Sequence, residues 1–368
     1  MIKSVGQLVG VNPGFDPDHV LTMQVEFVGK AWAEDPPVAA ATDRILDRLR
    51  GLPGVDSAAA ASQIPLGGNG DRWAFTIQAR PSPGLAETPY PERYGVTPDY
   101  FSVMKIPLLR GRLFTPADTA ASEPVIIISA ETARELWPGG DPIGQHVRIG
   151  DPAHGPWRTI IGIVGDVRHR ELATPPTMQL YTPQGQVTDS YLTIVIRSRG
   201  DAAQLASPAR QAIWSVAKDV PVSEVTLLED LVARSVGPRR FVMLLLELFG
   251  FVALLMTAVG VYGVISYSVG GRTRELGIRS ALGATPAAIV RLVLGSGLAL
   301  VALGLAVGVA VASLTTRFLQ SSLYSVSATD PPTFGGVVII LLIVAAAAQL
   351  VPVRRAVRVD PVIALRQD

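Results

Sequence analysis

The segment Arg272–Pro286 (RTRELGIRSALGATP) places three arginines and a glutamate between two long runs without charge. On a helix, Glu275 and Arg279 lie one turn apart on the same side, where their opposite charges can pair. Ile278 and Leu282 form an adjacent apolar strip, which makes the segment amphipathic. Such a helix can rest on lipid headgroups or bind a partner protein, and the periodicity leaves both interpretations open.

The rest of the chain lacks the patterns that indicate a catalytic or metal-binding site. It has no cysteine, no GxxxxGK[ST] nucleotide-binding loop, no GxSxG sequence and no HExxH sequence. Its histidines are scattered without the spacing of metal ligands: His19, His146, His154 and His169. We therefore expect no catalytic residue, no metal and no cofactor in this chain.

Two further polar motifs have simpler interpretations. Gly67–Arg72 (GGNGDR) is rich in glycine but lacks the Lys-Ser/Thr end of a phosphate-binding loop, and it predicts a turn. Asp166–Glu171 (DVRHRE) is a small basic cluster that follows a strand-like segment. We interpret it as the solvated end of a hairpin, with ligand binding as the alternative.

The C-terminal third of the chain has the composition of a membrane domain. Only 17% of all residues are charged, against about a quarter in soluble domains, and most residues beyond Phe241 are apolar. A helix of roughly 20 apolar residues crosses the core of a bilayer. Three segments meet that length, and we predict an all-α bundle of three transmembrane helices: Leu248–Val269, Leu292–Thr316 and Thr333–Val351, the last ended by Pro352.

The arginines that flank these segments predict their orientation, because cytoplasmic loops carry an excess of Lys and Arg. Loop 270–291 and the tail 352–368 are rich in arginine, whereas the loop between the second and third spans has only Arg317. The first loop and the tail are therefore predicted to be cytoplasmic, which places residues 1–237 outside. The arginines that set this orientation are Arg272, Arg274, Arg279, Arg291, Arg354, Arg355, Arg358 and Arg366.

Two features inside the apolar region could have specific roles. Glu247 stands at the start of the first span, seven residues after Arg240 on the same helical face. We interpret the two as an ion pair at the membrane edge, with proton transfer through Glu247 as the alternative. Gly304 and Gly308 form a GxxxG motif, which favours close packing of helices either within one bundle or against a second copy.

The region before the first span is predicted to be a mixed α+β extracytoplasmic domain over residues 20–227, divided into two lobes around residues 72–170 and the remainder. Residues 1–19 hold neither a signal peptide nor a span, so we interpret them as a linker that follows a missing transmembrane helix. The predicted strands are His19–Phe27, Pro124–Ser129, Thr159–Val167, Tyr191–Ser198 and Val222–Thr226. The predicted helices are Pro36–Arg50, Ala130–Trp137, Asp201–Ala217 and Leu227–Val236.

Several motifs together resemble one known family. RTRELGIRSALGAT looks like the cytoplasmic loop of MacB/FtsX-type ABC transporter permeases. Three segments of the outer region resemble the MacB-type periplasmic core domain, and Arg358–Arg366 (RVDPVIALR) resembles the tail of the family. The opening VNPGFDPDHVLTMQV is most similar to the second half of the long duplicated permeases. The three outer segments are Val96–Thr119, Trp137–Gly150 and Ile160–Leu172.

The resemblance implies a permease subunit in a bacterial inner membrane, without catalytic residues of its own. ATP and Mg²⁺ would be bound by a separate P-loop ATPase, and a second permease half or copy would complete the transporter. Residues 228–247 would form a stalk helix that transmits movement to the outer domain, for efflux or for mechanical work on an outer substrate. The residues that match the ATPase-coupling helix of the family are Arg272, Glu275, Leu276, Gly277, Ile278, Arg279, Leu282 and Gly283.

The family has four helices per half, one of them ahead of the outer domain, whereas three spans are visible in this sequence. The alternative function is therefore a membrane-anchored structural or sensory module, or a truncated remnant of a permease without an ATPase partner. The absence of a nucleophile–base pair disfavours a membrane-bound hydrolase. The net charge of +1 gives no reason to expect nucleic acid binding.

Overall fold

The computed structural model describes residues 11–78, 80, 88–151, 154–272, 275, 278–279, 282, 284–318 and 331–357. The chain divides into two compact units, one within Gln7–Pro238 and one within Arg239–Asp368. Predicted site residues Leu276, Gly277 and Gly283 lie outside the described residues, as does the C-terminal tail beyond Val357.

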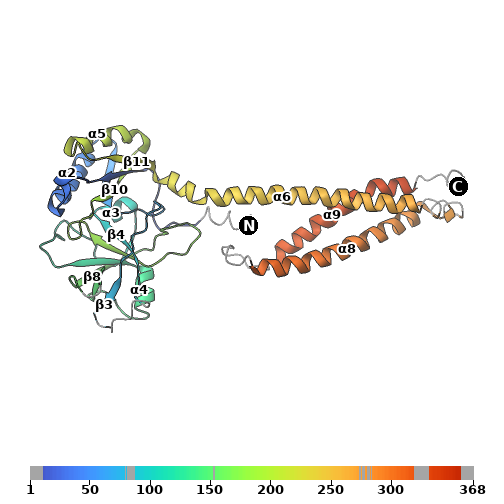
Figure 1. Ribbon diagram of the computed structural model, residues 1–368, viewed down its shortest axis with the longest axis horizontal. Coiled ribbons are helices and arrows are strands. Elements are labelled where there is room, and N and C mark those ends of the chain that lie inside the picture. Colours follow the sequence, from blue (N-terminus) through green and yellow to red (C-terminus); the bar gives the residue numbers. More distant parts are fainter. Residues whose placement is uncertain are drawn as a thin grey trace. The chain divides into compact units, whose positions relative to one another are not determined.

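The first unit is built on one mixed β-sheet with the strand order β11-β1-β10-β2-β4-β9-β6-β8-β7-β3, and β5 pairs with β8 beside this path (Figure 1). Its strands are β1 (Val20–Glu26), β2 (Val55–Ala61), β3 (Phe75–Ile77), β4 (Glu92–Val96), β5 (Leu108–Gly111), β6 (Val125–Ser129), β7 (His146–Ile149), β8 (Arg158–Val164), β9 (Gln179–Pro183), β10 (Tyr191–Ser198) and β11 (Val222–Leu227). Helices and strands in one domain confirm the predicted α+β class.

One half of the sheet is covered by two amphipathic helices, α2 (Asp35–Arg50) and α5 (Ala206–Val216), which pack on β1, β10 and β2 (Figure 1). The apolar positions of α2 recur at helical spacing, with Val38, Ile45 and Leu49 all buried, and the arginines lie on the outer face. A short 3-10 turn, η1 (Lys30–Trp32), precedes α2, and η2 (Ala202–Leu205) precedes α5.

The second half of the sheet has its own apolar core beside α4 (Ala130–Leu136), and a central core lies around α3 (Tyr100–Met104). Strand β9 lies between β4 and β6, parallel to β4. Residues beyond 170 therefore continue the same sheet, and the predicted division into two lobes stays a prediction. The segment before β9 has two adjacent prolines and no strand-like alternation, so no strand is evident there from the sequence.

The second unit consists of long apolar helices. α6 (Leu228–Gly271) begins in the first unit and ends in the second, and α8 (Pro286–Phe318) and α9 (Pro331–Val357) follow. Two segments are long and apolar enough to cross a membrane, Glu247–Gly271 and Gly335–Arg354. Within α8, a shorter apolar stretch covers Val301–Val311.

The predicted end of the third span at Pro352 is wrong, because α9 continues through this proline to Val357. A proline inside a helix removes one backbone hydrogen bond. Here both Pro352 and Val353 are buried, and Val353 packs with Ile265 and Ile289 of the other two helices. This packing favours continuation of the helix beyond the proline.

Candidate functional site

The loop between α6 and α8 carries the charged pair that its spacing predicts. Arg279 Nη2 lies 2.8 Å from Glu275 Oε1, and both side chains are about half exposed. Arg272 is also exposed. The apolar members of the predicted strip are exposed as well, with 42% of Ile278 and 83% of Leu282 accessible. An exposed apolar and charged surface of this kind suits a membrane surface or a protein partner.

A turn then leads the chain from this loop into α8. The backbone N–H groups of Leu282 and Ala284 donate to the carbonyl oxygens of Ile278 and Arg279, at 3.0 and 2.9 Å. These bonds satisfy carbonyl groups at the end of a helical segment. The N–H of Ala288 donates to Thr285 O, and Pro286 is the first residue of α8, where a missing N–H costs nothing.

The three long helices meet next to this loop. Ile265 and Val269 of α6, Ile289 of α8 and Val353 of α9 form one buried apolar cluster, with exposures between 5% and 9%. Val261, Val290 and Leu294 pack against it. The loop therefore connects α6 and α8 beside a cluster in which both helices pack against α9.

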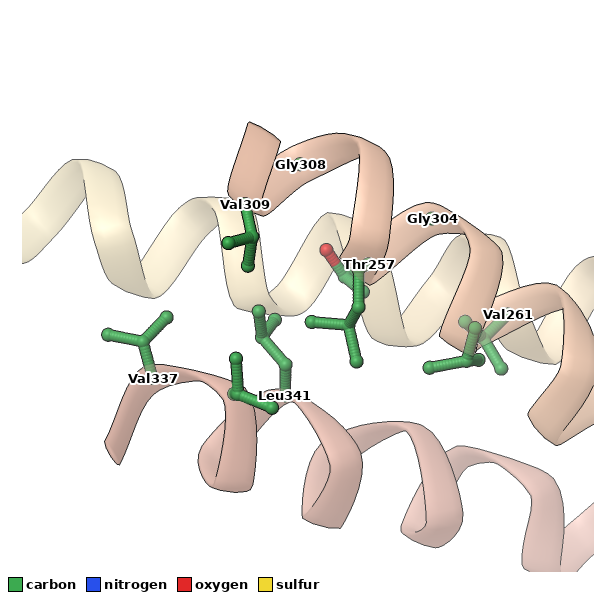
Figure 2. A pocket seen from close by; sticks show the side chains of 10 residues that line it. Thr257, Val261, Gly304, Gly308, Val309, Val337 and Leu341 are labelled. Carbon is green, nitrogen blue, oxygen red and sulfur yellow. The ribbon is translucent and has the colours of Figure 1, made fainter. Parts of the chain in front are cut away.

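Farther along the same helices lies a cavity of about 460 Å³ with almost entirely apolar walls. Figure 2 shows Thr257 and Val261 from α6, Val309 from α8, and Val337 and Leu341 from α9 around this space. Gly304 and Gly308 of α8 also line it, and a Cβ added at either glycine would meet no atom within 4 Å. Within the described part of the chain, the GxxxG motif therefore borders open space.

The predicted pair at the membrane edge consists of Glu247 and Arg240 of α6. Glu247 is exposed on α6, and the side chain of Arg240 lies outside the described side chains. The pair therefore stays a prediction.

The Asp166–Glu171 motif is not the solvated hairpin end that we expected. His169 is 3% exposed; its Nε2 lies 2.8 Å from Asn69 O and its Nδ1 lies 2.5 Å from the Tyr94 hydroxyl. Because a carbonyl only accepts, Nε2 carries the proton and Nδ1 accepts from Tyr94. Burial lowers the pKa of His169, in agreement with a neutral ring.

The same motif holds neighbouring parts of the outer domain together. Asp166 accepts hydrogen bonds from the backbone N–H of Glu131 at 2.6 Å and from Arg134 at 3.0 Å, at the start of α4. Arg170 lies 3.3 Å from the buried carboxylate of Glu92. The charged composition of DVRHRE gave no sign that its histidine enters the core.

The Gly67–Arg72 motif begins with a bend at Gly67 and Gly68, directly after a turn at Pro65 and Leu66, close to where the sequence predicts a turn. Asp71 in this motif accepts from Arg93 Nε at 2.8 Å, and its carbonyl oxygen accepts from the Arg93 N–H at 2.7 Å. In the residues that the structure describes, no group of three or more His, Cys, Asp or Glu side chains could hold a metal ion.

Comparisons with known proteins agree with this architecture. The family model of the MacB-like periplasmic core domain matches residues 2–212, and that of the FtsX-like permease C-terminal matches residues 247–361. The uncharacterized ABC transporter permease YknZ of Bacillus subtilis is 27% identical over 291 residues, which cover 74% of this chain and 69% of YknZ.

Other relatives are longer than this chain. The macrolide export ATP-binding/permease protein MacB 2 of Aeromonas hydrophila is 28% identical over 364 residues, which cover 93% of this chain and 52% of that protein. The probable syringafactin export protein SyfD of Pseudomonas syringae is 29% identical over 293 residues, which cover 74% of this chain and 42% of SyfD. The crystal structure of the periplasmic region of MacB from Actinobacillus actinomycetemcomitans matches 59% of this chain and 94% of that structure, at 14% identity and a TM-score of 0.40.

Proposed function

Because the chain belongs to the MacB/FtsX-type ABC transporter permeases, we propose that it is the permease subunit that couples ATP hydrolysis in a separate P-loop ATPase to movement of its outer domain. ATP and Mg²⁺ are bound by that partner. The relatives MacB 2 and SyfD are named as ATP-binding/permease proteins, which supports an ATPase as the partner.

The exposed loop beside the convergent helix ends is the observation that carries this proposal. Its Glu275–Arg279 pair and the exposed Leu282 offer charged and apolar contacts to a partner. Arginines alone are sufficient for a helix that binds lipid headgroups. A glutamate held one turn from an arginine also presents an oriented hydrogen-bond acceptor to a protein partner. The loop therefore acts as the coupling helix that docks into the ATPase.

α6 is the element that transmits the movement. Its first residue, Leu228, is fully buried in the central core of the outer unit, and Val269 near its end belongs to the cluster beside the coupling loop. The two residues lie in one uninterrupted helix. Residues 228–247 form the stalk in this scheme, and a displacement of the loop is transmitted through this stalk to the outer domain.

The proposed topology is that of a multi-pass protein of the bacterial inner membrane. α8 and α9 join α6 as the second and third spans, and the outer domain is extracytoplasmic. The coupling loop and the C-terminus are cytoplasmic, as the distribution of arginines indicates. A second permease half or copy completes the assembly, and its work is efflux or mechanical action on an outer substrate.

The test is capture of the full chain from native membranes through a C-terminal tag, scored for a co-eluting P-loop ATPase and for ATP turnover. Wild type is expected to retain the ATPase, and Glu275→Lys is expected to lose it, because the change breaks the ion pair and reverses an exposed charge. Asp219→Lys, an equivalent charge reversal on the exposed surface of the outer domain, serves as the matched control.

A stable, membrane-inserted chain that retains no ATPase would contradict the proposal and favour the membrane-anchored module. Equal retention by wild type and Glu275→Lys would exclude the coupling role of the loop while leaving a complex through other surfaces.

A further inference from the structure

One N–H group of the buried His169 ring faces two acceptors in the outer domain. His169 Nε2 donates to Asn69 O at 2.8 Å, and Glu92 Oε2 lies 3.7 Å from the same nitrogen. The second distance is too long for a hydrogen bond. In this state the ring therefore bonds the backbone of residues 67–70, which we call the Asn69 loop, and leaves the carboxylate of β4 without that donor.

The carboxylate of Glu92 has a free oxygen next to this histidine. Its Oε1 lies 3.3 Å from Arg170 and 3.7 Å from Arg72, whereas its Oε2 is buried without a hydrogen-bond partner among the described residues. A buried acceptor without a partner costs free energy. Because this oxygen is inaccessible from outside, its donor has to come from within the domain, and His169 is already beside it.

Protonation of His169 changes which of the two acceptors is preferred. Hydrogen bonds of a charged donor with a charged acceptor are stronger than those of neutral groups, so an imidazolium ring favours the carboxylate of Glu92 over the carbonyl of Asn69. On the other side of the ring, the Tyr94 hydroxyl donates to Nδ1. A hydroxyl can also accept, so rotation of its O–H lets Tyr94 bond the protonated ring as well.

The surrounding groups determine the pH at which the ring takes up a proton. Burial and the nearby Arg170 lower the pKa of His169, whereas Glu92 and the Asn69 carbonyl raise it, and the lowering dominates. Burial raises the pKa of Tyr94, which stays uncharged. The state with a neutral, buried ring is therefore fully favoured above about pH 6.5 and loses stability as the pH falls below that value.

The Asn69 loop lies beside the first turns of α6. Gly67 and Asn69 line a small pocket together with Leu231 of α6. Leu66, directly before the loop, belongs to the central core against which Leu231 packs, and its N–H donates to His169 O at 2.7 Å. The backbone and the ring of His169 thus both hold this segment, and loss of the ring contact would loosen the loop next to α6.

We propose that His169 is a pH-sensitive switch: its neutral ring holds the Asn69 loop through Asn69 O, and in mild acid the protonated ring turns to Glu92 and releases the loop beside α6. The proposal concerns the outer domain alone and is independent of whether the loop between α6 and α8 binds an ATPase.

A spin label on the Asn69 loop tests this switch. The chain has no cysteine, so a single introduced cysteine is labelled specifically. Gly70 is a suitable position, because its φ is not positive and a Cβ there would meet no atom within 4 Å. The full chain with Gly70→Cys is placed in nanodiscs, and the mobility of the label is measured by electron paramagnetic resonance. Mobility is expected to rise between about pH 8 and about pH 5, with a midpoint below about 6.5.

Two variants in the Gly70→Cys chain assign the response to its residues. His169→Gln should abolish the rise in mobility, because glutamine takes up no proton in this range. Glu92→Gln removes the negative charge without changing the shape of the side chain, and it should move the midpoint to a pH lower by about one unit or more. His146→Gln, at an exposed histidine of the same domain, is the matched control and should keep the original midpoint.

A label mobility that does not depend on pH in the Gly70→Cys chain would overturn the proposal. So would an unchanged rise in His169→Gln, or an unchanged midpoint in Glu92→Gln. Tryptophan emission is recorded over the same pH range, and a rise in mobility that coincides with unfolding of the domain would also overturn it. The pH series of the Gly70→Cys chain and its emission record hold even where a further variant fails to fold.

Discussion

Arg279 donates from Nη2 to Oε1 of Glu275 at 2.8 Å, and this pair stands in the loop between two long apolar helices. An exposed pair of this kind stabilises a helix by only about 0.3–0.5 kcal/mol. Its contribution to the stability of the chain is therefore small, and a large effect of its mutation on partner binding would indicate a direct contact.

Exchange of the two charges distinguishes two effects. One is the presence of the ion pair, and the other is which position carries the negative and which the positive charge. Glu275→Arg combined with Arg279→Glu keeps the ion pair but reverses the direction in which each charge faces a partner. If the proposed docking depends on the individual charges, the double variant should lose the ATPase as completely as Glu275→Lys. Recovery of co-purification in the double variant would show instead that only the helical conformation matters.

Arg93 is predicted to be the most sensitive ion-pair residue of the outer domain. It is 2% exposed, donates to Asp189 at 2.5 and 3.1 Å, and lies 4.2 Å from the ring of Trp73. Arg93→Met leaves the half-buried carboxylates of Asp71 and Asp189 without their partner, which should destabilise the domain by about 3–5 kcal/mol.

The tryptophans of the chain provide a specific probe for this loss. All five lie between residues 32 and 214, so their fluorescence in the full chain reports on the outer domain alone. Arg93→Met should unfold at a clearly lower urea concentration than wild type. Arg110→Met, which breaks an exposed pair with Asp141, serves as the control and should change the midpoint little.

Acid should weaken the outer domain partly through Asp118. Hydrogen bonds from Arg112 hold the pKa of this carboxyl below its usual value, although burial acts in the opposite direction. A group whose folded pKa is lowered stabilises the protein fully above its unfolded pKa, about 3.9 for Asp. This contribution disappears as the pH falls through the lower folded value.

Asp118→Asn should therefore lower the free energy of unfolding near neutral pH by about 1–3 kcal/mol, which is measured as a lower urea midpoint. It should also show a smaller change of midpoint between about pH 6 and about pH 3 than wild type does. Asp219→Asn, at an exposed position of the same domain outside this pair, is the control. An unaltered pH dependence in Asp118→Asn would contradict the assigned role of this pair.

The glycines of α8 give a prediction about helix packing. A Cβ at Gly304 or Gly308 would enter the open cavity, so the double change to alanine should not lower the thermal stability of the single chain in nanodiscs. If the same face also packs against a second copy, the extra methyl groups should reduce crosslinking between copies. A loss of stability in the isolated chain would show that the cavity closes in the membrane.

Periodicity and composition were sufficient for the elements with a strong pattern. The alternation in β1 and the helical spacing in α2 placed both within one residue of their observed starts, and the uncharged runs located the three long helices. Features determined by tertiary contacts were missed. His169 belongs to a charged motif but hydrogen bonds inside the core, and α9 continues past Pro352 because Val353 has packing partners.

Strand β2 shows the same limitation most clearly, because its sequence Val55–Ala61 (VDSAAAA) is typical of a helix rather than a strand. In the sheet, Ala58 and Ala60 pack in the core beneath α2, whereas Ala59 and Ala61 pack in the core around α3. Helices cover both faces of this strand, so small side chains are required on both. That requirement arises from the assembled fold and is absent from local propensity.

Ala59→Leu tests this explanation. Ala59 is completely buried beside the core around α3, and a larger side chain must displace well-packed neighbours. Overpacking of this kind should cost about 1–3 kcal/mol, even though leucine is far more hydrophobic than alanine. Ala40→Leu, at an exposed position of α2, is the control and should leave the tryptophan-monitored urea midpoint nearly unchanged. A midpoint for Ala59→Leu at or above that of wild type would show that the space between β2 and α3 is not filled. Close packing would then not explain the alanines of β2.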